Sequence, residues 1–287
     1  MLFSKRILVV LDSGPQSRNA LHRAQLISER MACDLELIWV GKSTPWSGIE
    51  ADMSALAKSE ICFTQEVVTD DLIDAVCKRW KQDHFALLVK GCDPRHSSRK
   101  LLASRDWKLL RNTPCPVLLV KHDHHWAHGR ILAAVNTTTH NPALRANNQG
   151  ILMLAGFIAR ALDVPLHAVI ATPPAMQGAE PEMQSQVLID QRAQRCAETV
   201  LSDMNLTVDQ LHIGEGPPEH WIPKVSKEID ASLVVIGTHA RRGMSAALLG
   251  NTAERILDQL NTDILVLRAG LSEPLKPLIK EVDTAVS

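Results

Sequence analysis

Short runs of apolar residues alternate along the chain with longer segments in which apolar residues recur at helical spacing. The first run is Ile7–Leu11, and the periodic pattern that follows it predicts a helix from about 15 to 31. The alternation continues to a last apolar run at 263–268. Continuous apolar strands that alternate with helices are typical of a parallel sheet covered by helices on both faces. The pattern therefore predicts an α/β fold.

Two series of strands are expected, one in each half of the chain. In the first half the predicted strands cover 7–11, 35–40, 61–68, 85–90 and 116–121, and the predicted helices cover 15–31, 50–60, 70–82 and 104–111. In the second half the predicted strands lie near 131–135, 165–170, 206–212, 232–237 and 263–268. Ligands of such sheets bind at the carboxyl ends of the strands beside the point where the strand order reverses. Each half is therefore expected to carry its site after its first and fourth strands.

The two series are an internal repeat. The recurring segments are Ile7–Leu11 with Ile131–Val135, Phe85–Gly91 with Ala231–Gly237, and Pro116–Lys121 with Asp263–Arg268. Their separation grows from 124 to 146 and 147 residues, so we place an insertion in the second half, around 172–186. We expect two domains, 1–126 and 129–270, joined by a polar connector at 122–129. A C-terminal arm at 271–287 follows, with a short helix over 275–283.

Composition narrows the functional classes. A net charge of -1 and a pI of about 6.9 give no general attraction to nucleic acid or to an anionic membrane. An aromatic content of 3% without tyrosine disfavours stacking platforms for single-stranded nucleic acid. No apolar run approaches a membrane span, and the first strand follows the N-terminus without a secretory signal, so we expect a cytoplasmic protein. The six cysteines are scattered without a Cys-x-x-Cys pair, and reduced thiols are expected.

The segment after the fourth strand of the second half carries the clearest chemistry. An apolar strand ends at Gly237, a loop with two arginines follows, and Gly250 precedes a predicted helix. Backbone amides at a helix start donate to phosphate oxygens, and arginine adds charge-assisted hydrogen bonds. The candidate phosphate-binding residues are Gly237, Thr238, His239, Arg241, Arg242, Gly243, Gly250, Asn251 and Thr252.

This segment resembles the signature of the universal stress protein family, Gly-x2-Gly-x9-Gly-[Ser/Thr]. Gly237 and Gly250 match its first and third glycines, whereas Ala240 and Asn251 stand where the family has glycine and a hydroxyl residue. Two tandem copies resemble the bacterial universal stress protein E subgroup. The resemblance covers about 1–270 and implies an adenine nucleotide alpha hydrolase-like fold with a five-stranded parallel sheet in each domain.

The resemblance also implies how the domains meet. In this family the last strands commonly pair across a two-fold axis to form a dimer. With two copies in one chain, the same contact can form internally as a pseudo-dimer, and a homodimer of the chain stays an alternative. The other arrangement left open is a last strand that a helix covers in each domain.

In ATP-binding members of the family, an aspartate at the end of the first strand contacts the nucleoside. Asp12 matches it in the first half, and Asn136 takes its place in the second. The loop of the first half contains Asp93 and Pro94, which disfavour phosphate binding, although Ser104 keeps the hydroxyl residue. The resemblance therefore implies that the second domain binds ATP, AMP or a related ligand, with Asn136 among its contacts.

Other functions stay open at this point. They are a ligand-independent interaction or scaffold protein with two degenerate sites, a slow ATPase that uses His239, and a binder of an apolar ligand between the halves. Two metal sites are also weighed. One is His122, His124, His125 and His128 in the connector, which could hold zinc or nickel or simply be solvated. The other is Cys196 with His212.

Overall fold

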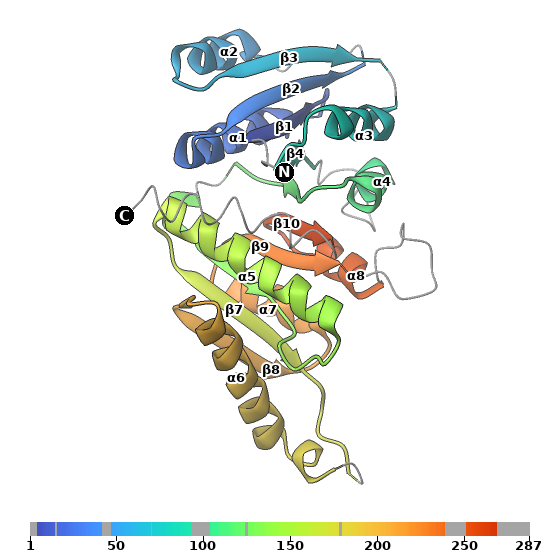
Figure 1. Cartoon of the computed structure of the whole chain (residues 1–287), viewed down its shortest axis with the longest axis vertical. Coiled ribbons are helices and arrows are strands. Elements are labelled where there is room, and N and C mark those ends of the chain that lie inside the picture. Colours follow the sequence, from blue (N-terminus) through green and yellow to red (C-terminus); the bar gives the residue numbers. More distant parts are fainter. Residues whose placement is uncertain are drawn as a thin grey trace.

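A computed structural model describes residues 5–14, 16–41, 47–69, 71–92, 104–123, 126–177, 180–238 and 251–268 of the 287-residue chain. The ten strands of this described part form one sheet in the order β3-β2-β1-β4-β5-β10-β9-β6-β7-β8 (Figure 1). We call β1–β5 with their helices the first half and β6–β10 with theirs the second half. The order within each half reverses between its first and fourth strands, as expected for a ligand-binding α/β sheet.

The elements follow the predicted alternation closely. The first half contains β1 (Arg6–Leu11), α1 (Ser17–Met31), β2 (Asp34–Val40), α2 (Ile49–Lys58), β3 (Phe63–Val68), α3 (Leu72–Gln82), β4 (Leu87–Gly91), α4 (Ser104–Asn112) and β5 (Val117–Val120). The second half contains η2 (Trp126–His128), β6 (Arg130–Ala134), α5 (Pro142–Leu162), β7 (Leu166–Thr172), η3 (Pro181–Met183), α6 (Gln186–Asp203), β8 (Gln210–Glu215), α7 (Pro218–Glu228), β9 (Ala231–Thr238), α8 (Asn251–Gln259) and β10 (Asp263–Arg268).

The strands of each half are parallel, and the two halves join through β5 and β10. These two last strands pair antiparallel, with Leu118 opposite Leu265 and Leu119 opposite Ile264. The contact confirms the predicted pseudo-dimer, in which the last strands pair inside one chain, and it excludes a helix over those edges. The outer edges of the described sheet are β3 and β8.

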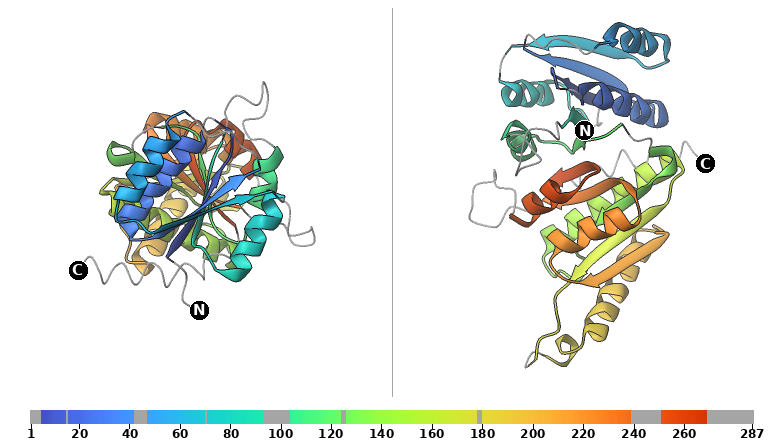
Figure 2. Two further views of the ribbon diagram at one scale, coloured as in Figure 1. Left: turned by 90° about the horizontal axis from the view of Figure 1, so that it is seen from above. Right: turned by 180° about the vertical axis from the view of Figure 1, so that it is seen from behind.

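Helices cover both faces of the sheet (Figure 2). Helices α1, α2, α5 and α6 pack on the face that carries Ile7, Val9 and Leu118, and α3, α4, α7 and α8 pack on the opposite face. Strand β1 is buried from Ile7 to Leu11 because it is covered on both sides. This explains why the strands appear in the sequence as continuous apolar runs.

The register of the strands assigns a counterpart in the second half to each core position of the first. Ile7 pairs with Leu35 as Ile131 pairs with Leu166, so β2 and β7 correspond at a separation of 131 residues. The separation reaches 146 only between β3 and β8. The single insertion predicted around 172–186 is therefore wrong in part, because seven additional residues lie earlier, between β6 and β7.

One strand boundary was also predicted wrongly. The third strand of the second half covers Gln210–Glu215 and not 206–212. Asn205 has a left-handed backbone (φ 50°), which turns the chain after α6. Leu206 then packs beside Gly156 of α5, so its apolar character reflects a half-buried position in a turn and not a strand.

The connector between the halves is more than a polar linker. Trp126 is fully buried, and its indole N–H donates to Asp263 at 3.0 Å. Asp263 also pairs with the buried Arg23 of α1 at 3.0 Å, and the Arg23 guanidinium lies 4.5 Å from the centre of the Trp126 ring. The burial of Trp126 was not predicted from the sequence, because a single apolar residue among polar neighbours does not produce a hydrophobic pattern.

Candidate functional site

The carboxyl ends of β1 and β4, and of β6 and β9, form equivalent edges in the two halves. Val10 pairs with Lys90 across β1 and β4, and Ala134 pairs with Ile236 across β6 and β9. Asp12 and Asn136 follow these residues by two positions, just beyond the ends of β1 and β6, so they are counterparts at these edges. The predicted nucleoside contact is thereby placed at the switch point of each half.

In the first half, Asp12 is held by its own neighbours. Its carboxylate accepts hydrogen bonds from the Gly14 amide and the Ser17 hydroxyl, each at 2.8 Å, and lies 3.2 Å from the Lys90 ammonium. Burial opposes the charge of Asp12, but Lys90 and the two hydrogen bonds outweigh it and hold its pKa below the usual value. Asp12 is therefore a partner of Lys90 and not a free acceptor.

Lys90 lies between two carboxylates. Its ammonium is 3.0 Å from Asp106 of α4 and donates to the Gly91 carbonyl at 2.9 Å. Lys90 and Asp106 are both buried, with 6% and 2% of their surfaces exposed. Burial disfavours the charged amine, but the neighbouring carboxylates, Asp106 first, prevail and raise its pKa. The first half thus fills its own switch point with the ion cluster Asp12–Lys90–Asp106.

The second half has none of these charges at the equivalent positions. Ile236 stands where the first half has Lys90, Ala253 where it has Asp106, and Asn136 where it has Asp12. Asn136 Oδ1 accepts a hydrogen bond from the Thr138 hydroxyl at 3.0 Å. The Asn136 side chain is exposed, so its amide stays accessible. This edge can therefore accommodate a ligand without breaking an ion pair.

Two asparagines of α5, Asn147 and Asn148, support this edge and were not recognised in the sequence. Asn148 accepts from the Asn136 amide at 3.1 Å and donates to the Asn136 carbonyl at 2.5 Å, and in this way it fixes the end of β6. Ser17 occupies the counterpart position and bonds the Asp12 amide at 3.0 Å. The signal was present, since two adjacent asparagines interrupt the otherwise apolar buried side of α5.

Gly237 has a structural reason that the motif alone did not reveal. A methyl group at this position would overlap the amide of Asn147 and the side chain of Ile151 in α5. Asn147 is 4% exposed, and its Oδ1 has no hydrogen-bond partner among the described residues. Gly91, the counterpart of Gly237, is in turn covered by the backbone of Gln16. The first glycine of the motif therefore permits close helix packing in both halves.

The described residues include only the two ends of the predicted phosphate loop. Gly237 and Thr238 end β9, Asn251 begins α8, and Thr252 is exposed in its first turn. The remaining candidates lie outside the described residues, namely His239, Arg241, Arg242, Gly243 and Gly250. The ends of the loop are set by the pairing of β9 with β6 and by the start of α8.

The metal hypotheses find no support among the residues described. His122 pairs with Asn261 at 3.0 Å, His128 is exposed, and His124 and His125 lie outside the described part. No group of three or more potential ligands occurs in that part of the chain. The pair Cys196–His212 is contradicted, because α6 covers one face of the sheet and His212 points to the other, where its ring bonds His167 at 2.9 Å.

The cysteines and the helices also bear on the predictions made from the sequence. All six cysteines are free, and Cys33, Cys92 and Cys115 are buried. Within the residues that the structure describes, no helix is both long enough and apolar enough to cross a membrane.

Comparisons with known proteins agree with this architecture. The family model described as "Universal stress protein family" matches residues 129–268. The universal stress protein E homolog of Haemophilus influenzae is 34% identical over 68% of this chain and 66% of its own length. Universal stress protein E of Photorhabdus laumondii is 27% identical over 95% of this chain and 98% of its own length. The matches to the Salmonella typhi and Escherichia coli proteins span only 54% of those relatives.

A solved structure extends the similarity to nearly the whole chain. A putative universal stress protein from Pseudomonas aeruginosa is 32% identical, covers 96% of this chain and 98% of its own, and superposes with a TM-score of 0.78. The superposition shows that this solved protein shares the mostly parallel α/β sheet described above. The chain belongs to the universal stress protein family and resembles its E-type members.

Proposed function

We propose that this chain is a cytoplasmic stress-response protein that binds one adenine nucleotide, such as ATP or AMP, in its second half. The ligand would lie at the carboxyl ends of β6 and β9, against Asn136 and the loop 237–252. The observation that carries the proposal is the difference between the two switch points. The first is filled by Lys90 between Asp12 and Asp106, whereas the second has uncharged residues at all three positions.

The residues at the second switch point suit a nucleotide. Asn136 presents an exposed amide at the strand end, and Thr252 lies exposed in the first turn of α8. A helix start favours anions, and the two arginines of the loop add positive charge for phosphate oxygens. Asn136 stands where the family has the aspartate that contacts the nucleoside, and its amide can still accept and donate hydrogen bonds there.

Isothermal titration of the purified chain with ATP, ADP and AMP tests the proposal. We expect binding with one ligand per chain, because the described switch point of the first half is filled by its ion cluster. Replacement of both loop arginines, Arg241→Ala with Arg242→Ala, should weaken ATP binding about tenfold or more, since each charge-assisted hydrogen bond contributes roughly 1.5–3 kcal/mol.

The first half supplies a matched control. The double variant Arg95→Ala with Arg99→Ala removes two arginines from the corresponding loop and should leave the dissociation constant unchanged. Two ligands per chain, or equal losses in both double variants, would contradict a single site in the second half. No heat at millimolar nucleotide would favour the ligand-independent interaction protein instead. Release of phosphate by the native chain, lost in His239→Ala, would establish the slow ATPase.

A further inference from the structure

An apolar cleft lies between the two halves, on the sheet face covered by α1 and α5. Its volume is about 50 Å³, and its lining includes Ile7, Leu87, Pro116, Met31, Leu154 and Phe157. This space exceeds the roughly 15 Å³ that one water needs, but a buried water also needs polar partners. The cleft is lined by apolar side chains and is therefore suited to an apolar side chain and not to water.

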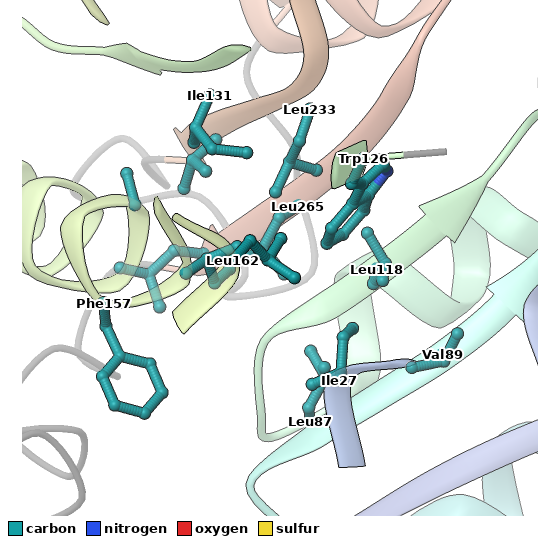
Figure 3. Close-up of a cluster of buried hydrophobic side chains, with 14 of the residues drawn as sticks. Ile27, Leu87, Val89, Leu118, Trp126, Ile131, Phe157, Leu162, Leu233 and Leu265 are labelled. Carbon is teal, nitrogen blue, oxygen red and sulfur yellow. The ribbon is translucent and has the colours of Figure 1, made fainter. Parts of the chain in front are cut away.

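The pseudo-two-fold axis between the halves relates this cleft to the place where Trp126 is buried. The axis passes between Leu118 and Leu265, which are counterparts and face each other across β5 and β10. Ile7 and Leu87 line the cleft, and their counterparts Ile131 and Leu233 lie on the Trp126 side of Leu265 (Figure 3). The cleft and the Trp126 position are thus symmetry-related parts of one apolar region, and Trp126 itself also lines the cleft.

The two groups that hold Trp126 have apolar counterparts in the cleft. Asp263 accepts the indole N–H, and its counterpart is Pro116. Arg23 covers the indole ring, and its counterpart on α5 is Leu154. Pro116 and Leu154 both line the cleft. Where Trp126 meets two polar side chains, the cleft therefore has two apolar ones. Such a lining suits aliphatic side chains, which have no hydrogen-bonding group.

The chain itself provides a segment at the right place. Trp126 belongs to the connector that follows β5, and the segment that follows β10 is the counterpart of that connector. Val266 pairs with Val117, so the chain leaves β10 beside Cys115 and Pro116, at the wall of the cleft. Nineteen residues follow Arg268, and Leu275, Leu278, Ile279 and Val282 keep the spacing of one helix face.

We propose that the C-terminal arm, residues 271–287, inserts this apolar stripe into the cleft and thereby links α1 of the first half to α5 of the second. The four residues before Lys5 are the alternative segment, since Leu2 precedes Ile7 by the same five residues that separate Trp126 from Ile131. They are too few to present a helical stripe, and the arm is the occupant that matches both the length and the apolar pattern.

Cys33 makes the proposal measurable, because its thiol lines the cleft. Burial raises the pKa of this thiol to about 11, so it should react slowly with a maleimide in the intact chain. We expect the double variant Leu275→Ser with Leu278→Ser to increase the rate of Cys33 labelling about tenfold or more, as read by peptide mass spectrometry, because local opening governs access. The control variant Lys276→Ser with Lys280→Ser changes the polar side of the stripe and should leave the rate unchanged.

Cys92 and Cys115 are internal references, since both are buried in the core on the opposite face of the sheet. Faster labelling of Cys33 alone reports release of the arm, whereas faster labelling of all three reports unfolding. If the arm variants unfold the chain, a second measurement tests the contact between the arm and the cleft directly. In the otherwise native chain, at least one of Leu275→Cys, Leu278→Cys and Ile279→Cys should form an intrachain disulfide with Cys33 under mild copper-catalysed oxidation by oxygen, and the distant, exposed Val187→Cys should not.

Unchanged Cys33 labelling together with no disulfide would overturn the proposal. It would also be overturned if Leu2→Ser with Phe3→Ser released Cys33 while the arm variants did not. Protection of Cys33 that rises with protein concentration would assign the cleft to a second copy of the chain. Protection lost on removal of a co-purified apolar molecule, seen by native mass spectrometry, would assign it to that molecule. None of these outcomes depends on nucleotide binding.

Discussion

The two halves share one fold but have chemically different side chains at corresponding positions. At the switch point the first half has the ion cluster Asp12–Lys90–Asp106, and the second has uncharged residues. At the outer strands the first half has Glu36 and Glu66, both paired with Arg79. Their counterparts in the second half are two histidines that bond each other, His167 and His212. Charge has been compensated internally in one half and replaced by neutral groups in the other.

This difference separates the features that the fold requires from those that vary between the two switch points. The glycine at the end of the fourth strand is kept in both halves because a helix or turn packs onto it. The charges are not kept, because nothing in the packing of the sheet requires them. A motif glycine therefore indicates the family, whereas the groups around it indicate whether the site is open.

The largest expected change in stability comes from replacing Lys90 of the first half with isoleucine, the residue at the corresponding position of the second half. Lys90→Ile should destabilise the first half by about 3–5 kcal/mol, because it leaves two carboxylates without their buried cation. Urea unfolding of the full chain, followed by hydrogen exchange of the first-half core, measures this change. The matched variant Ile236→Val in the second half should cost only about 0.5–1.5 kcal/mol.

A compensated variant sharpens the same comparison. Adding Asp12→Asn and Asp106→Ala to Lys90→Ile copies the uncharged set of the second half and should restore most of the lost stability. A cost below about 1 kcal/mol for Lys90→Ile alone would mean that the ion cluster is not the group that fills the first site, since breaking a buried pair costs several times more.

The glycine positions give the next largest effect. Gly91→Ala and Gly237→Ala should each destabilise the chain by about 1–3 kcal/mol through overpacking. Gly91→Ala should be the worse of the two, because a methyl group would overlap the backbone of Gln16, whereas at Gly237 it meets side chains. Thermal unfolding of the two variants under one buffer condition compares them.

A second-site change separates packing from backbone strain at Gly237. Asn147→Ala removes the amide that Gly237 faces and should recover part of the stability lost in Gly237→Ala. If the double variant is as unstable as the sum of the two single variants, close packing on Asn147 is not the reason for this glycine.

Much of the fold could be predicted from the sequence because buried parallel strands are continuous apolar runs. The pairing of β5 with β10 was expected from the family resemblance and is observed. Strand β8 was displaced in the prediction because Leu206 is apolar for a different reason, packing in a turn. Pattern alone does not separate an apolar turn from an apolar strand.

The candidate site was harder to predict because its character depends on contacts between distant segments. Lys90 looked like the polar end of a strand, and only the fold places Asp106 beside it, sixteen residues later. The roles of Asn147 and Asn148 could be recognised only from the structure, in which α5 packs on the ends of β6 and β9. The glycines and arginines of the loop were visible in the sequence, whereas their partners were not.

The smallest expected effect concerns the pair His167 and His212, which should make the stability of the second half depend on pH. Burial lowers the pKa of His167 and of His212; the positive charges of His212 and Arg130 add to this at His167, while Asp209 opposes it there and Glu228 opposes it at His212. The folded state therefore binds fewer protons than the unfolded state. The contribution of the pair is complete above the usual pKa of about 6.5 and is lost as the pH falls below it.

Urea midpoints measured from pH 7.5 to pH 5 should thus fall for the second half. The double variant His167→Gln with His212→Gln should abolish this fall at a cost on the order of 1 kcal/mol at pH 7.5, the typical net value of one hydrogen bond. The corresponding change in the first half, Glu36→Gln with Glu66→Gln, removes no histidine and should leave the pH dependence of the second half unaltered. An equal acid slope in native and His167→Gln/His212→Gln proteins would show that the neutral chemistry of the second half does not set its response to pH.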